Sequence, residues 1–250
     1  MSIKILLWDV DGTILNFKEA EKAAIRKGFK NMNLGECSDE MISDYSNIND
    51  NYWKRLERGE LTKKEILVMR FRDFFGKYGL DTSLCEEFNS HYQVDLGDTV
   101  CFNDDAYDII KKLKGKYLQF VVSNGTKVAQ TKKLERSGIG ELMDGVFISD
   151  VVGYEKPSRD FFESVFETIR EEYTKFDLSE VMIIGDSLTS DIRGGNNAGI
   201  ITCYYNPKIK KENNAGDDVV LKDRVLEGCK VDFEIGNLHL IYDILSENIV

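Results

Sequence analysis

Acidic and hydroxyl side chains follow three apolar runs of the sequence, each at the point where a run stops. The first run ends at Asp9 and Asp11, the second ends at Ser123, and the third is followed by Asp186 and Asp191. Ligands of an open parallel sheet bind beyond the carboxyl ends of its strands, so we expect these residues to share one edge. Clustered carboxylates are costly unless a cation lies among them, and hard oxygen ligands favour Mg²⁺. The pattern therefore predicts a magnesium site.

One lysine stands where it could reach this acidic edge. Lys156 precedes Pro157 and a stretch of helical periodicity that begins near Ser158. Proline keeps the residue before it out of the α region, which limits where Lys156 can point. An exposed loop lysine is the ordinary interpretation of such a residue. Beside a carboxylate cluster, however, the same lysine can pair with an acid and screen an incoming anion.

The elements that must position these residues are short apolar runs without polar alternation, which are typical of strands buried on both faces. They cover residues 4–10, 118–122, 146–148, 181–184 and 200–205. Amphipathic stretches between them predict helices over residues 104–114, 126–137, 158–173 and 189–198. The alternation predicts an α/β fold, with a doubly wound parallel sheet in a Rossmann-like core.

One long segment interrupts this alternation. Residues 17–92 contain no strand-like run, and their helical periodicity has room for roughly four helices. Such a crossover is longer than a βαβ unit needs, so it predicts an inserted all-helical cap subdomain. The catalytic core would then comprise residues 1–16 and 93–250. The charge-rich segment 208–230 is expected to be an irregular surface excursion.

Composition limits the classes of partner and compartment. The 250 residues carry 33 basic and 44 acidic side chains, a formal charge of −11, which disfavours nucleic acid polymers and membrane surfaces as partners. Five scattered cysteines form no CxxC pair, and two histidines leave no zinc-ligand spacing. Reduced thiols and the lack of a long apolar run predict a soluble, cytoplasmic protein.

Together these motifs resemble the haloacid dehalogenase-like hydrolase superfamily in order, spacing and position at strand ends. The four matching motifs are Asp9-Val10-Asp11-Gly12-Thr13, Ser123-Asn124-Gly125, Lys156, and Gly185-Asp186-Ser187-Leu188-Thr189-Ser190-Asp191. The helical insertion resembles the cap of the group that places it between the first and second motifs. The resemblance covers the whole predicted core.

The resemblance implies a role for each acid. Asp9 would be the nucleophile that attacks phosphorus and forms an aspartyl-phosphate, and Asp11 would act as acid and then as base. Mg²⁺ is the implied cofactor, with Asp9, Asp11 through its backbone carbonyl, Asp186 and Asp191 at the metal. An alternative for Asp191 is a helix N-terminal residue that interacts favourably with the helix dipole.

Further residues are implied to handle the phosphate. The implied catalytic set is Asp9, Asp11, Ser123 and Lys156, and the implied substrate-binding set is Thr13, Ser123, Asn124, Gly125 and Lys156. The helix that begins near Thr126 would help to hold the phosphate oxygens at its N-terminus. Lys156 would orient Asp9 and offset developing charge.

The second aspartate, Asp11, bears on the class of reaction. Members of the superfamily that act on carbon–halogen bonds resemble this pattern but lack that residue, so the resemblance implies oxygen–phosphorus chemistry. The stretches 47–72 and 185–199 and Asn206-Pro207 are similar to those of bacterial pyrimidine nucleotidases. We therefore expect a 5′-nucleotidase acting on a nucleoside monophosphate, as a monomer or homodimer.

Two alternatives to this activity stay open. A sugar-phosphate phosphatase or phosphomutase could use the same core, and a phospho-accepting signalling protein could use a similar acidic site. Cap residues could help to set the substrate, and the candidates are Asn47, Asn51, Trp53, Arg55 and Arg58. Trp53 could equally belong to the cap core, with the arginines on a solvated face.

Overall fold

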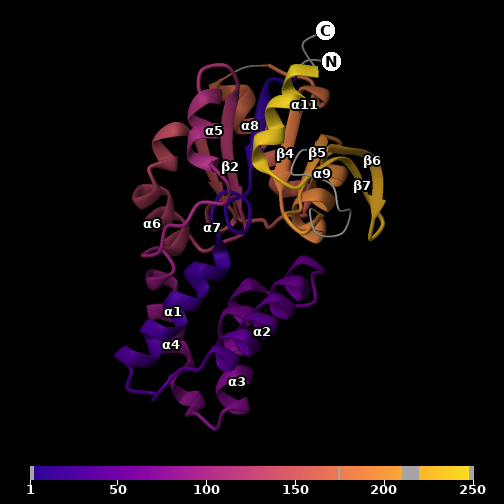
Figure 1. Cartoon of the computed structure of the whole chain (residues 1–250). Helices are drawn as coiled ribbons and strands as arrows, with labels where there is room; N and C mark the ends of the chain where they lie inside the picture. Colours follow the sequence, from indigo (N-terminus) through magenta and orange to yellow (C-terminus); the bar gives the residue numbers. More distant parts are fainter. Residues whose placement is uncertain (1–2, 174, 210–219, 248–250) are drawn as a thin grey trace. The chain divides into compact units, whose positions relative to one another are not determined.

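A computed structural model of the chain describes residues 3–173, 175–209 and 220–247 (Figure 1). Seven strands form one sheet, in the order β3-β2-β1-β4-β5-β7-β6. They are β1 (Ile5–Trp8), β2 (Leu118–Ser123), β3 (Gly145–Ile148), β4 (Val181–Gly185), β5 (Ile201–Tyr205), β6 (Val220–Leu226) and β7 (Cys229–Ile235). All neighbouring pairs are parallel except β6 and β7. The α/β fold with a doubly wound, mostly parallel sheet is thereby confirmed.

The first strand lies at the centre of the sheet and sets the position of the acidic edge. It pairs with β2 on one side and β4 on the other, so that Trp8 lies opposite Val121 and Ile184. From β1 the strand order proceeds outward in both directions, which makes its carboxyl end the topological switch point where ligands bind in open α/β sheets. The Asp9 amide continues this register and donates to the Ile184 carbonyl, at 2.9 Å.

Helices cover the sheet and bury its apolar side chains. The main ones are α5 (Ala106–Leu113), α7 (Ser149–Val152), α8 (Arg159–Glu172), α9 (Arg193–Ala198) and α11 (Ile241–Glu247). A further helix, α6 (Lys127–Ser137), follows β2 and belongs for most of its length to the second unit described below. Short helical turns are η2 (Ile139–Leu142), η3 (Leu178–Glu180), η4 (Leu188–Ile192) and η5 (Leu238–Leu240). The buried face of α8, which includes Phe161 and Val165, packs with Leu7 and Ile183 of the central strands. This contact explains the strong periodicity of the helix in the sequence.

The segment 208–230 corrects one prediction. We expected an irregular excursion, but β6 and β7 form an antiparallel hairpin at the edge of the sheet (Figure 1). Glu227 and Gly228 both have positive φ angles, 47° and 77°, as a two-residue type I′ turn requires. Lys222, Asp223 and Val225 are exposed on the edge strand, whose charges made it resemble a loop. The part of the predicted excursion at positions 210–219 lies outside the described residues.

A second compact unit is all-helical and comprises residues 17–101 together with 128–136. Its helices are α1 (Phe17–Asn31), α2 (Asp39–Glu57), α3 (Lys63–Lys77) and α4 (Cys85–Asp95), with the short turn η1 (Thr82–Leu84). We placed its end at residue 92, whereas α4 continues to Asp95 and Leu96 packs in the unit's aromatic core. Ala129 of α6 joins that same core. No helix among the described residues is both long and apolar enough to cross a membrane.

Three of the five candidate cap residues, Trp53, Arg55 and Arg58, contact neighbours inside the helical unit, and Asn47 and Asn51 are exposed. Trp53 packs beside a small cluster of Tyr52, Leu56 and Ile66. Arg58 forms an ion pair with Glu60 at 2.7 Å, and its side chain is half exposed. This agrees with the interpretation of Trp53 as part of the cap core and of the arginines as a solvated face.

Arg70, which the motifs did not single out, is the buried arginine of this unit. Its guanidinium donates to Asn49 Oδ1 at 2.6 Å and to Asn89 Oδ1 at 3.1 Å, and it lies against the ring of Tyr92. We expect Arg70→Met to lower the free energy of unfolding by about 3 kcal/mol, because it removes two charge-assisted hydrogen bonds from a buried network and a positive charge that offsets buried Glu21. Arg58→Met, the exposed control, should cost less than about 1 kcal/mol. Urea unfolding measures both, and equal losses would contradict this assignment.

Candidate active site

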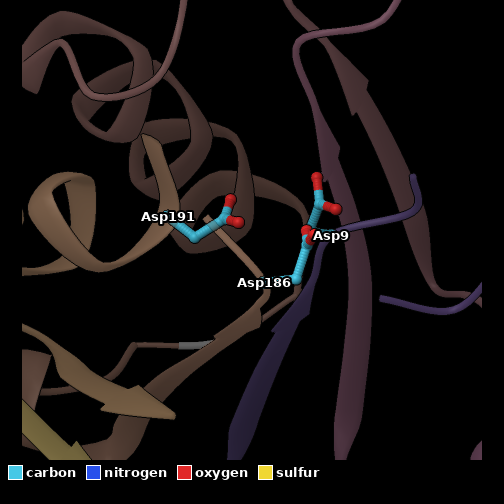
Figure 2. Close-up of side chains that lie close together, drawn as sticks. All are labelled: Asp9, Asp186 and Asp191. Atoms are coloured by element: carbon cyan, nitrogen blue, oxygen red, sulfur yellow. The ribbon is translucent and has the colours of Figure 1, made fainter. Parts of the chain in front are cut away.

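Three carboxylates converge at the carboxyl ends of the central strands (Figure 2). Asp9 follows β1, Asp186 follows β4, and Asp191 lies in the π-helical turn η4. One carboxylate oxygen from each residue lies within 4.8 Å of the others. Asp9 and Asp191 are buried, and Asp186 is the most exposed of the three. The edge predicted from the sequence therefore brings together these three acids.

Two glycines allow the backbone to approach these acids closely. Gly12 has a φ of +100°, and a Cβ at this position would lie 2.2 Å from Asp186 Oδ2. A Cβ on Gly185 would lie 2.2 Å from Asp191 Oδ2. Real side chains do not tolerate such distances, so glycine is required at both positions for the acids to keep this arrangement.

Lys156 occupies the centre of the group. Its ammonium donates to Asp9 Oδ1 at 2.8 Å, to Asp191 Oδ1 at 2.6 Å and to the Val122 carbonyl at 2.7 Å. The side chain of Asn124 holds its backbone in turn, because Nδ2 donates to the Lys156 carbonyl and Oδ1 accepts from the Lys156 amide. The lysine is 1% exposed, so it is a fixed part of the site and not a mobile loop residue.

The electrostatics show that the group needs more positive charge than Lys156 supplies. The pKa of Asp9 is raised to about 7, chiefly by burial and also by the charge of Asp191, although Lys156 opposes both. Burial, Asp9 and Asp191 likewise raise the pKa of Asp186 well above its usual range. Burial works against the charge of Lys156, but Asp191 and Asp9 more than compensate and raise its pKa. Three carboxylates around one ammonium leave an excess of two negative charges, which fits a divalent cation with oxygen ligands.

The other predicted residues lie around this group. Thr13 Oγ1 is 3.4 Å from Asp186 Oδ1, and Ser123 Oγ accepts from the Gly125 amide at 3.1 Å. Asn124 also donates to Ser190 Oγ, at 3.3 Å. The converging carboxylates do not include Asp11, although its charge contributes to the raised pKa of Asp9.

The sequence did not single out two residues that hold this site together, Ser190 and Asn103. Ser190 lies inside the fourth motif, so the motif alone could have predicted that it lies close to the acids. Asn103 donates through Nδ2 to the Gly12 and Thr13 carbonyls, at 2.8 and 3.0 Å. It lies 91 positions from Gly12 in a stretch without a recognisable motif, and no local pattern marks it.

Replacing Asp186 tests the repulsion among the acids. We expect Asp186→Asn to melt several degrees higher than wild type in a chelator, because one of the repelling charges is removed. In a protein of this size, a gain of about 1 kcal/mol raises the melting temperature by roughly 2–4 °C. Added Mg²⁺ should raise the melting temperature of wild type and leave the variant nearly unchanged.

Asp232→Asn is the matched control, since Asp232 accepts from the Thr202 amide on the neighbouring strand and lies outside the converging acids. This variant should keep the response to Mg²⁺. A wild-type protein whose melting temperature ignores Mg²⁺ would contradict a cation site among these acids. Differential scanning calorimetry measures all three proteins.

Comparisons with known proteins place this geometry in context. The family model of the haloacid dehalogenase-like hydrolases matches residues 6–204. The chain is 36% identical over 209 residues to the HAD-hydrolase YfnB of Bacillus subtilis, covering 83% of this chain and 86% of that protein. It is 34% identical to the pyrimidine 5′-nucleotidase PynA of Streptococcus pneumoniae, covering 83% and 85%. The crystal structure of YfnB bound to magnesium superimposes with a TM-score of 0.84 at 32% identity, covering 98% of this chain and 99% of that one.

Proposed function

Because the chain belongs to the haloacid dehalogenase-like hydrolase family, we propose that it is a Mg²⁺-dependent phosphomonoester hydrolase whose nucleophile is Asp9. One observation carries the proposal. The Asp9 carboxylate is held by buried Lys156 within a group of converging acids at the switch point of the sheet, and Asp11 follows two residues later. This arrangement combines an oriented nucleophile with a second acid close by.

The reaction proceeds in two steps, with the protons carried by Asp11. A carboxylate oxygen of Asp9 attacks phosphorus as the bond to the ester oxygen breaks, and Asp11 gives its proton to the departing alkoxide. A water molecule then attacks phosphorus and gives a proton to Asp11. The bond between phosphorus and the Asp9 oxygen breaks, so inorganic phosphate leaves and the Asp9 carboxylate is restored. Lys156 keeps Asp9 in one orientation throughout, because its ammonium is fixed by three acceptors.

The cation and the phosphate would be held by separate sets of residues. Asp9, Asp186, Asp191 and the Asp11 backbone carbonyl would hold Mg²⁺, which supplies positive charge where a carboxylate meets a phosphate dianion. The phosphate oxygens would be bound by Thr13, Ser123, Asn124, Gly125 and Lys156. Ser123, Asn124 and Gly125 lie just before α6 in the chain, and the positive end of the helix dipole at its N-terminus favours an anion.

We propose a nucleoside monophosphate as the substrate, with a pyrimidine base preferred. The support for this choice is the similarity to PynA over most of both chains, because PynA is a pyrimidine 5′-nucleotidase. A small phosphorylated metabolite also suits the acidic composition, since the local positive charge would come from the cation, Lys156 and a helix N-terminus. We propose the cytoplasm as its location.

A phosphate-release screen tests both parts of the proposal, the Mg²⁺-dependent hydrolysis and the nucleotide substrate. The purified protein is offered pyrimidine and purine nucleoside monophosphates, sugar phosphates and acyl phosphates, each with Mg²⁺ and with a chelator. We expect release only with Mg²⁺ and the highest kcat/KM for a pyrimidine nucleotide. Preference for a sugar phosphate, or transfer of the phosphoryl group to a second sugar hydroxyl, would overturn the substrate assignment alone. Stable phosphorylation of the protein without ester turnover would indicate a signalling role and overturn the hydrolase.

A further inference from the structure

Asn103 ties together the turn that carries two of the predicted catalytic acids. After β1 the chain makes a turn in which the Leu15 amide donates to the Val10 carbonyl and the Gly12 amide donates to the Leu15 carbonyl, both at 2.8 Å. These bonds leave the carbonyls of Gly12 and Thr13 to be satisfied from elsewhere. The Asn103 amide group donates to both of them, at 2.8 and 3.0 Å.

The chemistry of this contact admits one orientation of the Asn103 side chain. Two carbonyl oxygens face the amide group, so only its nitrogen, with two hydrogens, can lie between them. The backbone of the same residue is fixed as well, since its amide donates to the Ile14 carbonyl at 3.0 Å and its carbonyl accepts from the Ala106 amide at 3.1 Å. Asn103 is therefore anchored before its side chain reaches the turn.

The turn that Asn103 holds lies directly against Asp186. The Cα of Gly12 lies so near that an added Cβ would overlap the Asp186 carboxylate, and Thr13 Oγ1 is 3.4 Å from Asp186 Oδ1. A small rotation of the Gly12 or Thr13 peptide would therefore change the spacing between Asp186 and the acids that precede the turn.

On the basis of the proposed magnesium site, we infer that Asn103 is a positioning residue for it, acting through the Gly12 and Thr13 carbonyls and touching neither metal nor substrate. Its role is to hold the turn against Asp186, so that the acids on the two strands keep the spacing that a divalent cation needs. Loss of the two hydrogen bonds should weaken Mg²⁺ binding about tenfold. Substrate affinity at saturating Mg²⁺ should stay at the wild-type value.

Asn103→Asp is the decisive variant, because it keeps the shape of the side chain and places an acceptor against two acceptors. Asn103→Ala, which removes the group, is the second variant. Asn196→Asp is the matched control: Asn196 is also half-buried, and its Nδ2 donates to the Lys230 carbonyl at 2.8 Å, away from the turn. Titration calorimetry with MgCl₂ gives the affinity of each protein without any substrate.

We expect both Asn103 variants to bind Mg²⁺ about tenfold more weakly than wild type and Asn196→Asp to bind it normally. The half-saturating Mg²⁺ concentration for phosphate release should shift by the same factor, with KM for the ester unchanged at saturating Mg²⁺. Wild-type affinity in both Asn103 variants, or an equal loss in Asn196→Asp, would overturn the positioning role. A wild-type protein that binds no Mg²⁺ would instead overturn the proposed function.

Discussion

Asp9→Asn is expected to lower kcat for phosphate release by more than about 10⁴-fold, because the amide cannot serve as the nucleophile. The fold should survive, since the side chain keeps its shape and removal of one buried charge relieves repulsion from Asp191. The melting temperature in a chelator should therefore equal or exceed that of wild type. A continuous phosphate assay and calorimetry on the same preparation give both values.

Asp144→Asn serves as the control for this replacement. Asp144 accepts from the Gln119 amide at 2.7 Å, near the opposite end of β2 from the acidic edge, and takes no part in the converging group. The variant should turn over at the wild-type rate. Activity in Asp9→Asn within tenfold of wild type would mean that another group attacks the phosphorus.

Lys156→Met is expected to have the second largest effect, and it should act on stability and rate together. Removing the ammonium leaves Asp9 and Asp191 as buried carboxylates without their shared partner, which should cost about 3–5 kcal/mol of unfolding free energy. The loss should be larger in a chelator than in Mg²⁺, because the cation offers those acids a second source of positive charge. The kcat should fall by about 10²–10³-fold, since Asp9 loses its orienting contact.

A double-mutant cycle separates the contribution of charge from that of packing to the stability lost in Lys156→Met. Asp191→Asn in the background of Lys156→Met removes one uncompensated charge, so the double variant should recover part of the lost stability. Lys230→Met is the surface control, because its ammonium pairs with Asp232 at 2.5 Å but is 65% exposed, and its loss should cost less than about 1 kcal/mol. Strictly additive losses for Lys156 and Asp191 would contradict a shared electrostatic group.

The central strands and the acidic edge could be predicted because their signals are local. The runs that became β1 and β4 are continuously apolar, and the run of β2 is interrupted only at Gln119 before it ends at Ser123. This is the expected pattern of strands buried on both faces. Asp9 and Asp186 follow such runs directly, so the topology of a parallel sheet brings them together. Lys156 was recognised by its position in a motif, although its contact with Asp9 spans 147 residues.

Other features depend on contacts that no local pattern reports. Strand β6 carries three consecutive charged residues, Lys222 to Arg224, between two apolar pairs. Its pairing with β7 decides its conformation more than its composition does. The end of the helical unit is set by packing in the aromatic core, where Leu96 still takes part beyond the residue at which we ended it. Asn103 acts on a turn 91 positions earlier and has no partner within its own segment for its side-chain nitrogen.

Chemical trapping of the phosphorylated enzyme is the most direct measurement of the proposed mechanism. The protein is mixed with a preferred ester and Mg²⁺, quenched in acid during turnover and reduced with borohydride, which converts an aspartyl-phosphate into homoserine. Peptide mass spectrometry then locates the reduced residue. We predict homoserine at position 9 alone, and none when the ester is omitted or when Asp9→Asn is used. Reduction at another acid, or full turnover with position 9 unmodified at every quench time, would contradict nucleophilic attack by Asp9.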